Sequence, residues 1–400
     1  MNRNAVKSFA LGVVAGGFVF ALVMIVTNYF GIHLFAGSSL SDDIGKRAKV
    51  VESYIDKYYW KDDTSDKKIS EYAAKGMVAA LGDKYSVYYT SEELKDSMDN
   101  IAGDYAGIGA TLQADAKTGQ KTITEVQSGK PADKAGICVG DVVIKVNGKS
   151  TKEMSLSELV GQIKGEEGIR SVLTISREEN GETITKDITV VSEKIVKKTV
   201  TGKMLESNVG YIGISEFDKE TVNQFEKALT NLDQQGQKGL IIDLRNNGGG
   251  SLTAVISMLD RMLPKGKLIT EKNKAKGDRV YSSTDDKCFQ KPVVIVMNEN
   301  SASASEVFAG CMQDRKAASL VGTKSFGKGI VQTIFSLEKS CGGGIKLTTG
   351  EYLLPSGRCI QGEGLTPDVE VKYTGSTKEF CATDDNQLSK AVEVMKEKLQ

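Results

Sequence analysis

Two continuous apolar segments in the second half of the chain each run directly into a loop and a helix. Segment 239–245 leads into Asn-Asn-Gly-Gly-Gly and a helical pattern over 252–263, and segment 291–297 leads into a Ser-rich turn and a helical pattern that ends near Asp314. Strands without polar alternation are buried on both faces, which requires helices on each side of their sheet. The segments therefore predict an α/β core with an internal sheet covered by helices.

Other segments extend this pattern. A strand is expected over 209–214, a helix over 218–233, and a C-terminal helix over 386–399, whose apolar residues recur at helical spacing. Residues 42–95 also show helical spacing. They are rich in Tyr and contain the single Trp of the chain, and we expect these aromatic side chains to pack against another element or subunit.

A block of short strand-like segments lies between 100 and 191. It holds Pro-Ala-Asp-Lys-Ala-Gly at 131–136, Gly-Asp-Val-Val-Ile-Lys-Val-Asn-Gly at 140–148, a helical pattern over 155–164, and alternating strands near 171–177 and 183–190. This order closely resembles a PDZ domain, in which a Gly-x-Gly loop binds the terminal carboxylate of a peptide that adds to the sheet edge. The resemblance implies that Gly107, Ile108 and Gly109 form that loop. Taken alone, the two glycines would only permit a bend.

A long uncharged run opens the chain. Residues 8–27 are apolar over about the 20 positions that cross roughly 30 Å of hydrocarbon. Arg3 and Lys7 precede the run and the first charges behind it are acidic, so the positive-inside rule leaves the N-terminus in the cytoplasm. We expect a single-pass cell-membrane anchor within 1–40, with the rest of the chain on the extracytoplasmic side. A cleaved signal peptide is the alternative.

Charge and cysteine content narrow the classes of function. The 52 basic and 52 acidic residues balance, so no basic surface points to nucleic acid. The six cysteines have neither C-x-x-C spacing nor neighbouring histidines, as zinc sites would. We therefore expect no nucleic-acid partner, no metal and no cofactor.

The single histidine restricts the possible catalytic groups. His33 lies beside the apolar N-terminal run, so the folded region cannot contain a Ser-His-Asp triad. A serine nucleophile would need another base, for which lysine is the obvious candidate. Ser303 lies at a strand-to-helix turn, where the helix N-terminus favours developing negative charge and the N–H of Ala304 can act as an oxyanion donor. The alternative is that Ser303 and Glu306 only form a capping box.

Lys328 is the candidate base. It lies between Gly327 and Gly329, before a strand expected over 330–335. Its pKa would have to fall by about 3 units from roughly 10.4 for the amine to be neutral near pH 7. Burial can lower the pKa in this way, and the glycines allow close packing. Gln332 would face the same side of an extended segment and orient the amine. The alternative is an ordinary solvated lysine.

From about residue 70 to 370 the chain resembles the carboxyl-terminal processing (tail-specific) proteases. The matching stretches follow the family's order: Leu-Gly-Asp-Lys-Tyr-Ser at 81–86, the PDZ-like block, Asp-Leu-Arg-Asn-Asn-Gly-Gly-Gly at 243–250, Ser-Ala-Ser-Ala-Ser-Glu at 301–306, Phe-Gly-Lys-Gly at 326–329 with Gln332, and 348–368. The resemblance implies a crotonase-like core with Ser303 as nucleophile, Lys328 as base and Gln332 orienting it. The oxyanion donors would be Ala304 and a glycine of the 248–250 loop, Gly249 or Gly250. Dimerisation through terminal helices is also implied.

These inferences predict five parts of the chain and one function. The parts are the anchor (1–40), an N-terminal helical region (41–99), an inserted mainly-β PDZ domain (100–191), a serine protease core (192–375) and a C-terminal helix used in dimerisation (376–400). The expected function is a membrane-anchored serine endopeptidase that recognises the free C-termini of exported proteins. The alternatives are a catalytically inactive membrane-anchored PDZ adaptor and a crotonase-like acyl-CoA enzyme, which export argues against.

Overall fold

The structure is a computed structural model of the full chain. It describes residues 40–61, 65–102, 104–115, 118–164, 166–179, 181–375 and 384–400. The chain divides into two compact units, Met1–Ser70 and Glu71–Gln400. No helix within the described ranges is long and apolar enough to cross a bilayer. The predicted anchor and His33 lie outside these ranges, so the anchor stays a prediction.

The N-terminal region is helical, as predicted. Its helices are α2 (Leu40–Tyr58), α3 (Asp66–Ala79) and α4 (Ser91–Ala102). Helix α2 buries none of its residues. Tyr54, Tyr58 and Trp60 are all exposed, although the rings of Tyr54 and Tyr58 lie 5.6 Å apart. The aromatic packing expected for this part of the region is therefore not found within the described chain.

A six-stranded sheet forms the centre of the α/β core. Its strands, in spatial order, are β10 (Val200–Leu205), β11 (Val209–Ile214), β12 (Gly239–Asp243), β15 (Val293–Met297), β16 (Ala318–Gly322) and β19 (Val369–Glu370). Strand β10 is antiparallel to β11, and every other neighbouring pair is parallel. A short 3₁₀ turn, η1 (Glu206–Asn208), joins β10 to β11.

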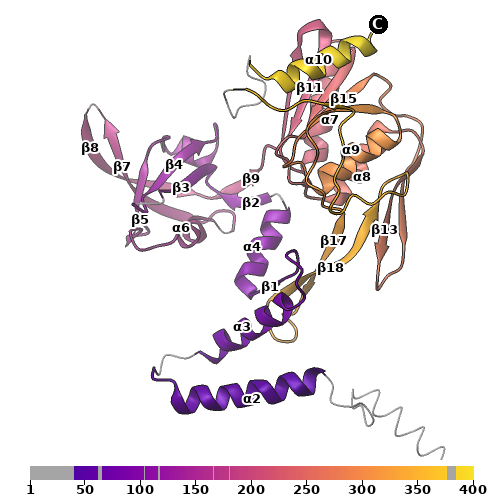
Figure 1. The fold of residues 1–400 in the computed structure, drawn as a ribbon. Coiled ribbons are helices and arrows are strands. Elements are labelled where there is room, and N and C mark those ends of the chain that lie inside the picture. The colour runs from indigo at the N-terminus through magenta and orange to yellow at the C-terminus, as the bar shows by residue number, and fades with distance from the viewer. Residues whose placement is uncertain are drawn as a thin grey trace, which may run out of the picture. The chain divides into compact units, whose positions relative to one another are not determined.

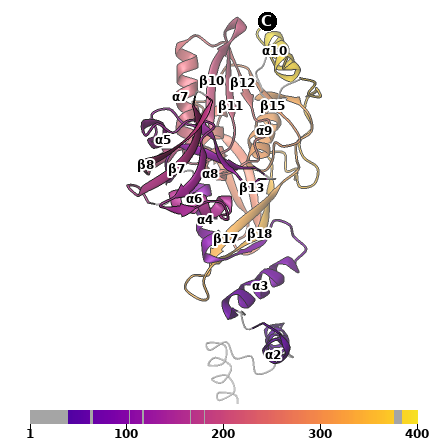
Figure 2. The same ribbon diagram turned by 90° about the vertical axis from the view of Figure 1, so that its left-hand side faces the viewer.

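Helices cover both faces of this sheet (Figures 1 and 2). The apolar cluster on one face includes Leu240 and Ile242 together with residues of α7 (Thr221–Gln234), α8 (Leu252–Met262) and α9 (Ala304–Asp314). Ile241 points into the cluster on the other face, with residues of α10 (Asn386–Lys398). This burial confirms the predicted internal sheet. Because the apolar face of α10 packs on its own chain, dimerisation through this helix would have to use its outer face.

A second, antiparallel sheet was not predicted from the sequence. Its strands are β1 (Val87–Tyr89), β18 (Gly344–Leu353), β13 (Gly266–Asn273) and β14 (Arg279–Ser283) in that order, with β17 (Ile330–Ser336) also paired with β18. Strand β1 comes from the N-terminal region and pairs with β18, so segments more than 250 residues apart in sequence lie side by side. This pairing places the loop before β1 near the loop before β17, which carries Lys328.

The third sheet lies in the PDZ-like block. Its order is β3 (Ala110–Ala114), β4 (Lys121–Val126), β5 (Val142–Val146), β7 (Arg170–Glu179) and β8 (Glu182–Val191), with β6 (Lys149–Ser150) paired with β5. The helices α5 (Pro131–Lys134) and α6 (Leu156–Ile163) cover its own apolar core, and β2 (Asp104–Gly107) pairs with β9 (Glu193–Val196). Strand β3 lies at a sheet edge, where a peptide strand can be added.

Candidate active site

Ser303 adopts a backbone conformation that helix capping does not require. As the N-cap of α9 it has φ 58° and ψ −117°. The N-cap serines of α6 and α8, Ser155 and Ser251, have extended backbones with φ −65° and −72°. Extended geometry is usual for an N-cap, whereas a positive φ at a non-glycine residue costs about 1–3 kcal/mol and is concentrated at functional sites. The sharp turn leaves Ser303 partly accessible between the buried Ala302 and Ala304.

Glu306 joins the Ser303 turn to the loop that carries Lys328. The N–H groups of Ser303 and Lys328 both donate to Glu306 Oε2, each at 2.8 Å. Its other oxygen, Oε1, accepts from Ser325 Oγ at 2.5 Å and from Gly327 N–H at 2.7 Å. The Glu306 side chain is fully buried. One carboxylate therefore holds the candidate nucleophile and the candidate base on adjacent loops, a role that the capping-box pattern did not reveal.

The surroundings of Lys328 lower the pKa of its amine. Burial is the largest cause, followed by repulsion from Lys346, while Asp83 and Glu306 act in the opposite direction. The flanking glycines are closely packed, since a Cβ at Gly329 would lie 2.7 Å from the backbone nitrogen of Gln361. This direction is the one that a neutral base requires.

In this structure the amine of Lys328 faces an aromatic ring. Its Nζ lies 4.9 Å from the centre of the Tyr85 ring, and within the described ranges no hydrogen bond joins Nζ to Ser303 Oγ. Tyr85 comes from the loop before β1. The resemblance had included this stretch, but it had assigned no function to the tyrosine.

Within the described ranges, no hydrogen bond joins the side chain of Gln332 to the amine of Lys328, although the strand pattern predicts one. Its Nε2 donates to the carbonyl of Ile330 at 3.4 Å. The side chains of Lys328 and Gln332 do not follow the regular alternation of a strand, because β17 begins only at Ile330 and its register shifts between Val331 and Gln332. The role of Gln332 in orienting the amine therefore stays a prediction that would need a rearrangement.

The glycine-rich loop lies against the Ser303 turn. A Cβ at Gly249, whose φ is 106°, would lie 2.9 Å from both Ser303 Cβ and Ala304 N. The N–H of Gly249 already donates to Asn247 Oδ1 at 2.9 Å. The N–H groups of Gly250 and Ala304 have no acceptor in the part of the chain that the structure describes. Of the predicted oxyanion donors, Ala304 and Gly250 are thus available, and Gly249 is occupied.

Asn247 was not singled out from the sequence, yet it connects both halves of the site. Its buried side chain donates from Nδ2 to the Ile214 carbonyl at 3.0 Å and accepts from Gly249 N–H. Its own carbonyl accepts from Ala302 N–H at 3.0 Å and from Ser305 Oγ at 2.9 Å. The asparagine therefore sets the position of the glycine loop relative to the nucleophile turn.

Arg245 ties the end of β12 to the C-terminal helix. Its buried guanidinium pairs with Asp243 and, at 2.8 Å, with Asp385 Oδ2. Asp385 also caps α10, where its Oδ1 accepts from Leu388 N–H at 3.0 Å. The strand that leads into the glycine loop is thus anchored at a position remote in sequence.

The PDZ-like block contains a second candidate site. A cavity of about 1130 Å³ lies between edge strand β3 and helix α6, and Gly107, Ile108 and Gly109 line it. Gly109 has a φ of 73°, and a Cβ there would lie 2.4 Å from Lys130 Cβ, so only glycine fits. The structure therefore brings the three predicted carboxylate-loop residues to one groove.

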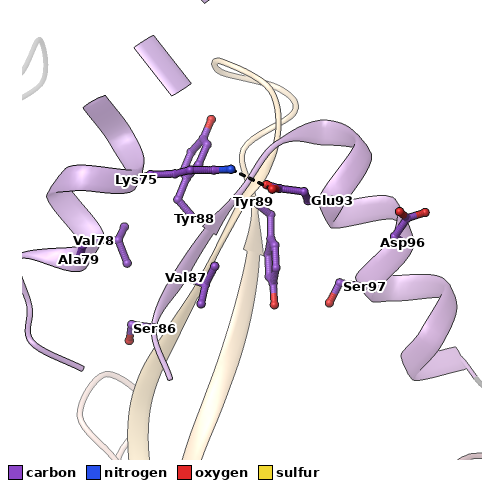
Figure 3. Close-up of a pocket in the computed structure, with 10 residues that line it drawn as sticks. All are labelled: Lys75, Val78, Ala79, Ser86, Val87, Tyr88, Tyr89, Glu93, Asp96 and Ser97. Carbon is purple, nitrogen blue, oxygen red and sulfur yellow. Dashed lines mark hydrogen bonds and ion pairs between the residues drawn. The ribbon is translucent and has the colours of Figure 1, made fainter. Parts of the chain in front are cut away.

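Another hollow, of about 580 Å³, lies between α3, β1 and α4 (Figure 3). Across it Lys75 Nζ donates to Glu93 Oε1 at 2.8 Å, and this hydrogen bond raises the pKa of Lys75. An amine held in its charged form cannot accept a proton. This hollow is therefore a weaker candidate for a catalytic site than the Ser303 turn.

Comparisons with known proteins agree with this geometry. The sequence profile of peptidase family S41 matches residues 208–371, and that of the PDZ domain matches residues 101–176. A "Probable CtpA-like serine protease" of Staphylococcus aureus is 34% identical over 397 residues, covering 96% of this chain and 78% of the relative. The chain belongs to peptidase family S41. It is a serine-type C-terminal processing peptidase that carries a PDZ domain.

Other similarities to this S41 peptidase cover less of the chain. A Staphylococcus saprophyticus protein of the same description is 34% identical, covering 89% of this chain and 73% of the relative. The solved photosystem II D1 C-terminal processing protease is 27% identical with a TM-score of 0.48, covering 83% of this chain and 88% of that one. A Bacteroides fragilis protein solved as an S41 protease is 18% identical with a TM-score of 0.50, covering 84% and 91%, and it supports the fold alone.

Within the described ranges of this S41 peptidase, no group of three or more His, Cys, Asp and Glu side chains could hold a metal ion.

Proposed function

We propose that this S41 peptidase is a membrane-anchored endopeptidase with a Ser303–Lys328 dyad. The observation that carries the proposal is the shared acceptor: Ser303 N–H and Lys328 N–H donate to the same oxygen of buried Glu306. These two bonds tie the backbone of a strained, partly accessible serine to that of a lysine whose pKa is lowered by burial.

In the proposed mechanism the neutral amine of Lys328 accepts the proton of Ser303 Oγ as the oxygen attacks the scissile carbonyl. The N–H groups of Ala304 and Gly250 stabilise the developing oxyanion; one such donor commonly contributes about 3 kcal/mol to lowering the barrier. The Lys328 ammonium then protonates the leaving amine, and water hydrolyses the acyl-enzyme. Gln332 orients the amine once the dyad is assembled.

The PDZ groove captures the substrate's C-terminus in this proposal. Backbone N–H groups of Gly107, Ile108 and Gly109 bind the terminal carboxylate, and the peptide pairs with edge strand β3. The substrates are protein or peptide chains with a free C-terminus.

The remaining proposals concern assembly and location. The uncharged N-terminal run anchors the chain in the cell membrane with the catalytic domain outside the cytoplasm. The α/β core is crotonase-like, in keeping with its largely parallel sheet. The chain forms a homodimer, and helix α2, which buries none of its residues, is with the nearby Trp60 a surface that such a contact would cover.

Cleavage of matched peptides tests the function. Wild type should cut a peptide with a free C-terminus faster than the same peptide with an amidated C-terminus, and Ser303→Ala and Lys328→Ala should cut neither. Cleavage by both mutants at the wild-type rate would exclude the dyad. Capture of the free C-terminus without cleavage by wild type would favour the inactive PDZ adaptor.

A further inference from the structure

The amine of Lys328 faces the ring of Tyr85, and it makes no hydrogen bond with any residue in the described ranges. Two carboxylates lie near enough to influence its pKa, but their oxygens are used by other donors. Asp83 accepts from Ser86 Oγ and Thr348 Oγ1, each at 2.6 Å, while Glu306 accepts the four donors of the Ser303 and Lys328 loops. Within the described ranges Lys328 has no ion pair.

The loop that carries Tyr85 is firmly held. Tyr85 N–H donates to Asp83 Oδ1 at 3.0 Å, and Thr348 N–H on β18 donates to Ser86 Oγ at 3.1 Å. A second lysine, Lys84, places its Nζ 5.0 Å from the centre of the same ring. The ring therefore has a defined position, and it attracts ammonium groups through its negative face.

We propose that Tyr85 is a positioning residue that holds the amine of Lys328 away from Ser303 in the resting enzyme. The inference rests on the proposed function, because it assumes that Lys328 is the base. An aromatic face binds an ammonium only weakly, so the amine can leave when substrate arrives. A carboxylate partner would keep the amine charged and bound, which would oppose its use as a base.

The chain connects Tyr85 directly to the PDZ groove. From Tyr85 it runs through β1 and α4 to β2, which ends at Gly107, the first residue of the proposed carboxylate loop. The S41 sequence profile matches this chain only from residue 208 onward, so Tyr85 lies outside the matched region. Binding of a peptide tail at Gly107–Gly109 is thus linked by about twenty residues of chain to the loop that holds the base.

The test measures the rate at which a fluorophosphonate probe labels Ser303 in the full-length enzyme without any peptide, and compares this rate between wild type and variants at Tyr85. Tyr85→Leu removes the ring face and keeps an apolar side chain, and Tyr85→Met is a second replacement should leucine unfold the loop. A ring–ammonium attraction of ordinary strength corresponds to about a fivefold change in the fraction of molecules whose Lys328 amine is free of the ring. We expect about fivefold faster labelling at pH 7 in either variant, with the acid limb of the pH profile moved to lower pH.

The conservative variant Tyr85→Phe keeps the ring and should restore the slow wild-type rate. Lys84→Ala, which removes the other amine beside the ring, is the matched control and should label as wild type does. The charged groups that also face Lys328, namely Lys346 on β18, Asp83 in the loop and Glu306 on α9, are unchanged in every variant. A difference between the pH profiles of wild type and a Tyr85 variant would therefore be due to the ring.

Three results would overturn the inference. Labelling of Tyr85→Leu and Tyr85→Met at or below the wild-type rate would show that the ring does not restrain the amine. Equal acceleration in Tyr85→Phe would assign the effect to the hydroxyl or the loop. Absence of Ser303 labelling in wild type even with a saturating free-C-terminus peptide would reject the proposed dyad and this inference with it, whereas the first two results leave the dyad standing.

Discussion

Replacing Glu306 by glutamine should separate the two loops of the active site. The carboxylate accepts four hydrogen bonds, two at each oxygen. Glutamine keeps one acceptor oxygen and turns an NH₂ group toward the donors of the other pair, so two bonds to a buried anion are lost. Bonds to charged groups contribute about 1.5–3 kcal/mol each, which gives a loss of about 3–6 kcal/mol.

This loss should be visible in both stability and chemistry. The melting temperature of Glu306→Gln should fall by roughly 4–7 °C. Well below that temperature, Ser303 should react with a fluorophosphonate probe much more slowly, because neither the serine nor the lysine is held in place. Thermal unfolding followed by circular dichroism and mass spectrometry of the labelled protein would measure the two effects.

Glu158 provides a matched control from the PDZ domain. It is the glutamate of the capping box at α6, accepts from Ser155 N–H at 2.6 Å, and is exposed. Glu158→Gln makes the same chemical change without a link to a second loop, so stability and labelling should hardly change. If Glu306→Gln melted and labelled like Glu158→Gln, the proposed role of Glu306 would be refuted.

Three further variants test other parts of the site. Lys346→Gln removes a positive charge that lowers the pKa of Lys328. The pKa of Lys328 should therefore rise, and the acid limb of the pH–rate profile should move to higher pH, whereas an unchanged limb would contradict this electrostatic effect. Asn247→Ala frees the glycine loop and should lower kcat by about 100-fold with little change in KM, as loss of an oxyanion donor does, whereas a change in KM alone would point to substrate binding. Gly109→Ala forces a side chain against Lys130 at positive φ and should raise KM for a free-C-terminus peptide by roughly tenfold, from a cost of about 1–2 kcal/mol; equal KM values in titrations of both proteins would exclude the loop as the carboxylate site.

Local sequence patterns were sufficient to predict the elements that position the nucleophile. The strand at 209–214, the buried strands that became β12 and β15, and the helix after Ser303 have the predicted type and nearly the predicted bounds. Each depends on the periodicity of one continuous segment, which a sequence displays directly.

The contacts that complete the site could not be predicted in this way. Asp385 pairs with Arg245 across 140 positions, and β1 pairs with β18 across the whole PDZ domain. The sequence presents Glu306 only as part of a capping box, because three of the four groups that donate to it belong to another loop. Such contacts depend on how separate segments pack, and no local period records them. The position of the Gln332 side chain could not be read from the sequence for a related reason, since a regular strand was assumed where the register shifts.

The most direct test of the central claim is a titration of the Lys328 amine by NMR in enzyme labelled at lysine Cε and saturated with a free-C-terminus peptide. The Lys328→Arg variant would assign the signal. The proposed mechanism predicts a pKa near neutrality, well below the ordinary value of roughly 10.4. A signal that titrates at the ordinary value in this complex would leave Ser303 without its base and contradict the account.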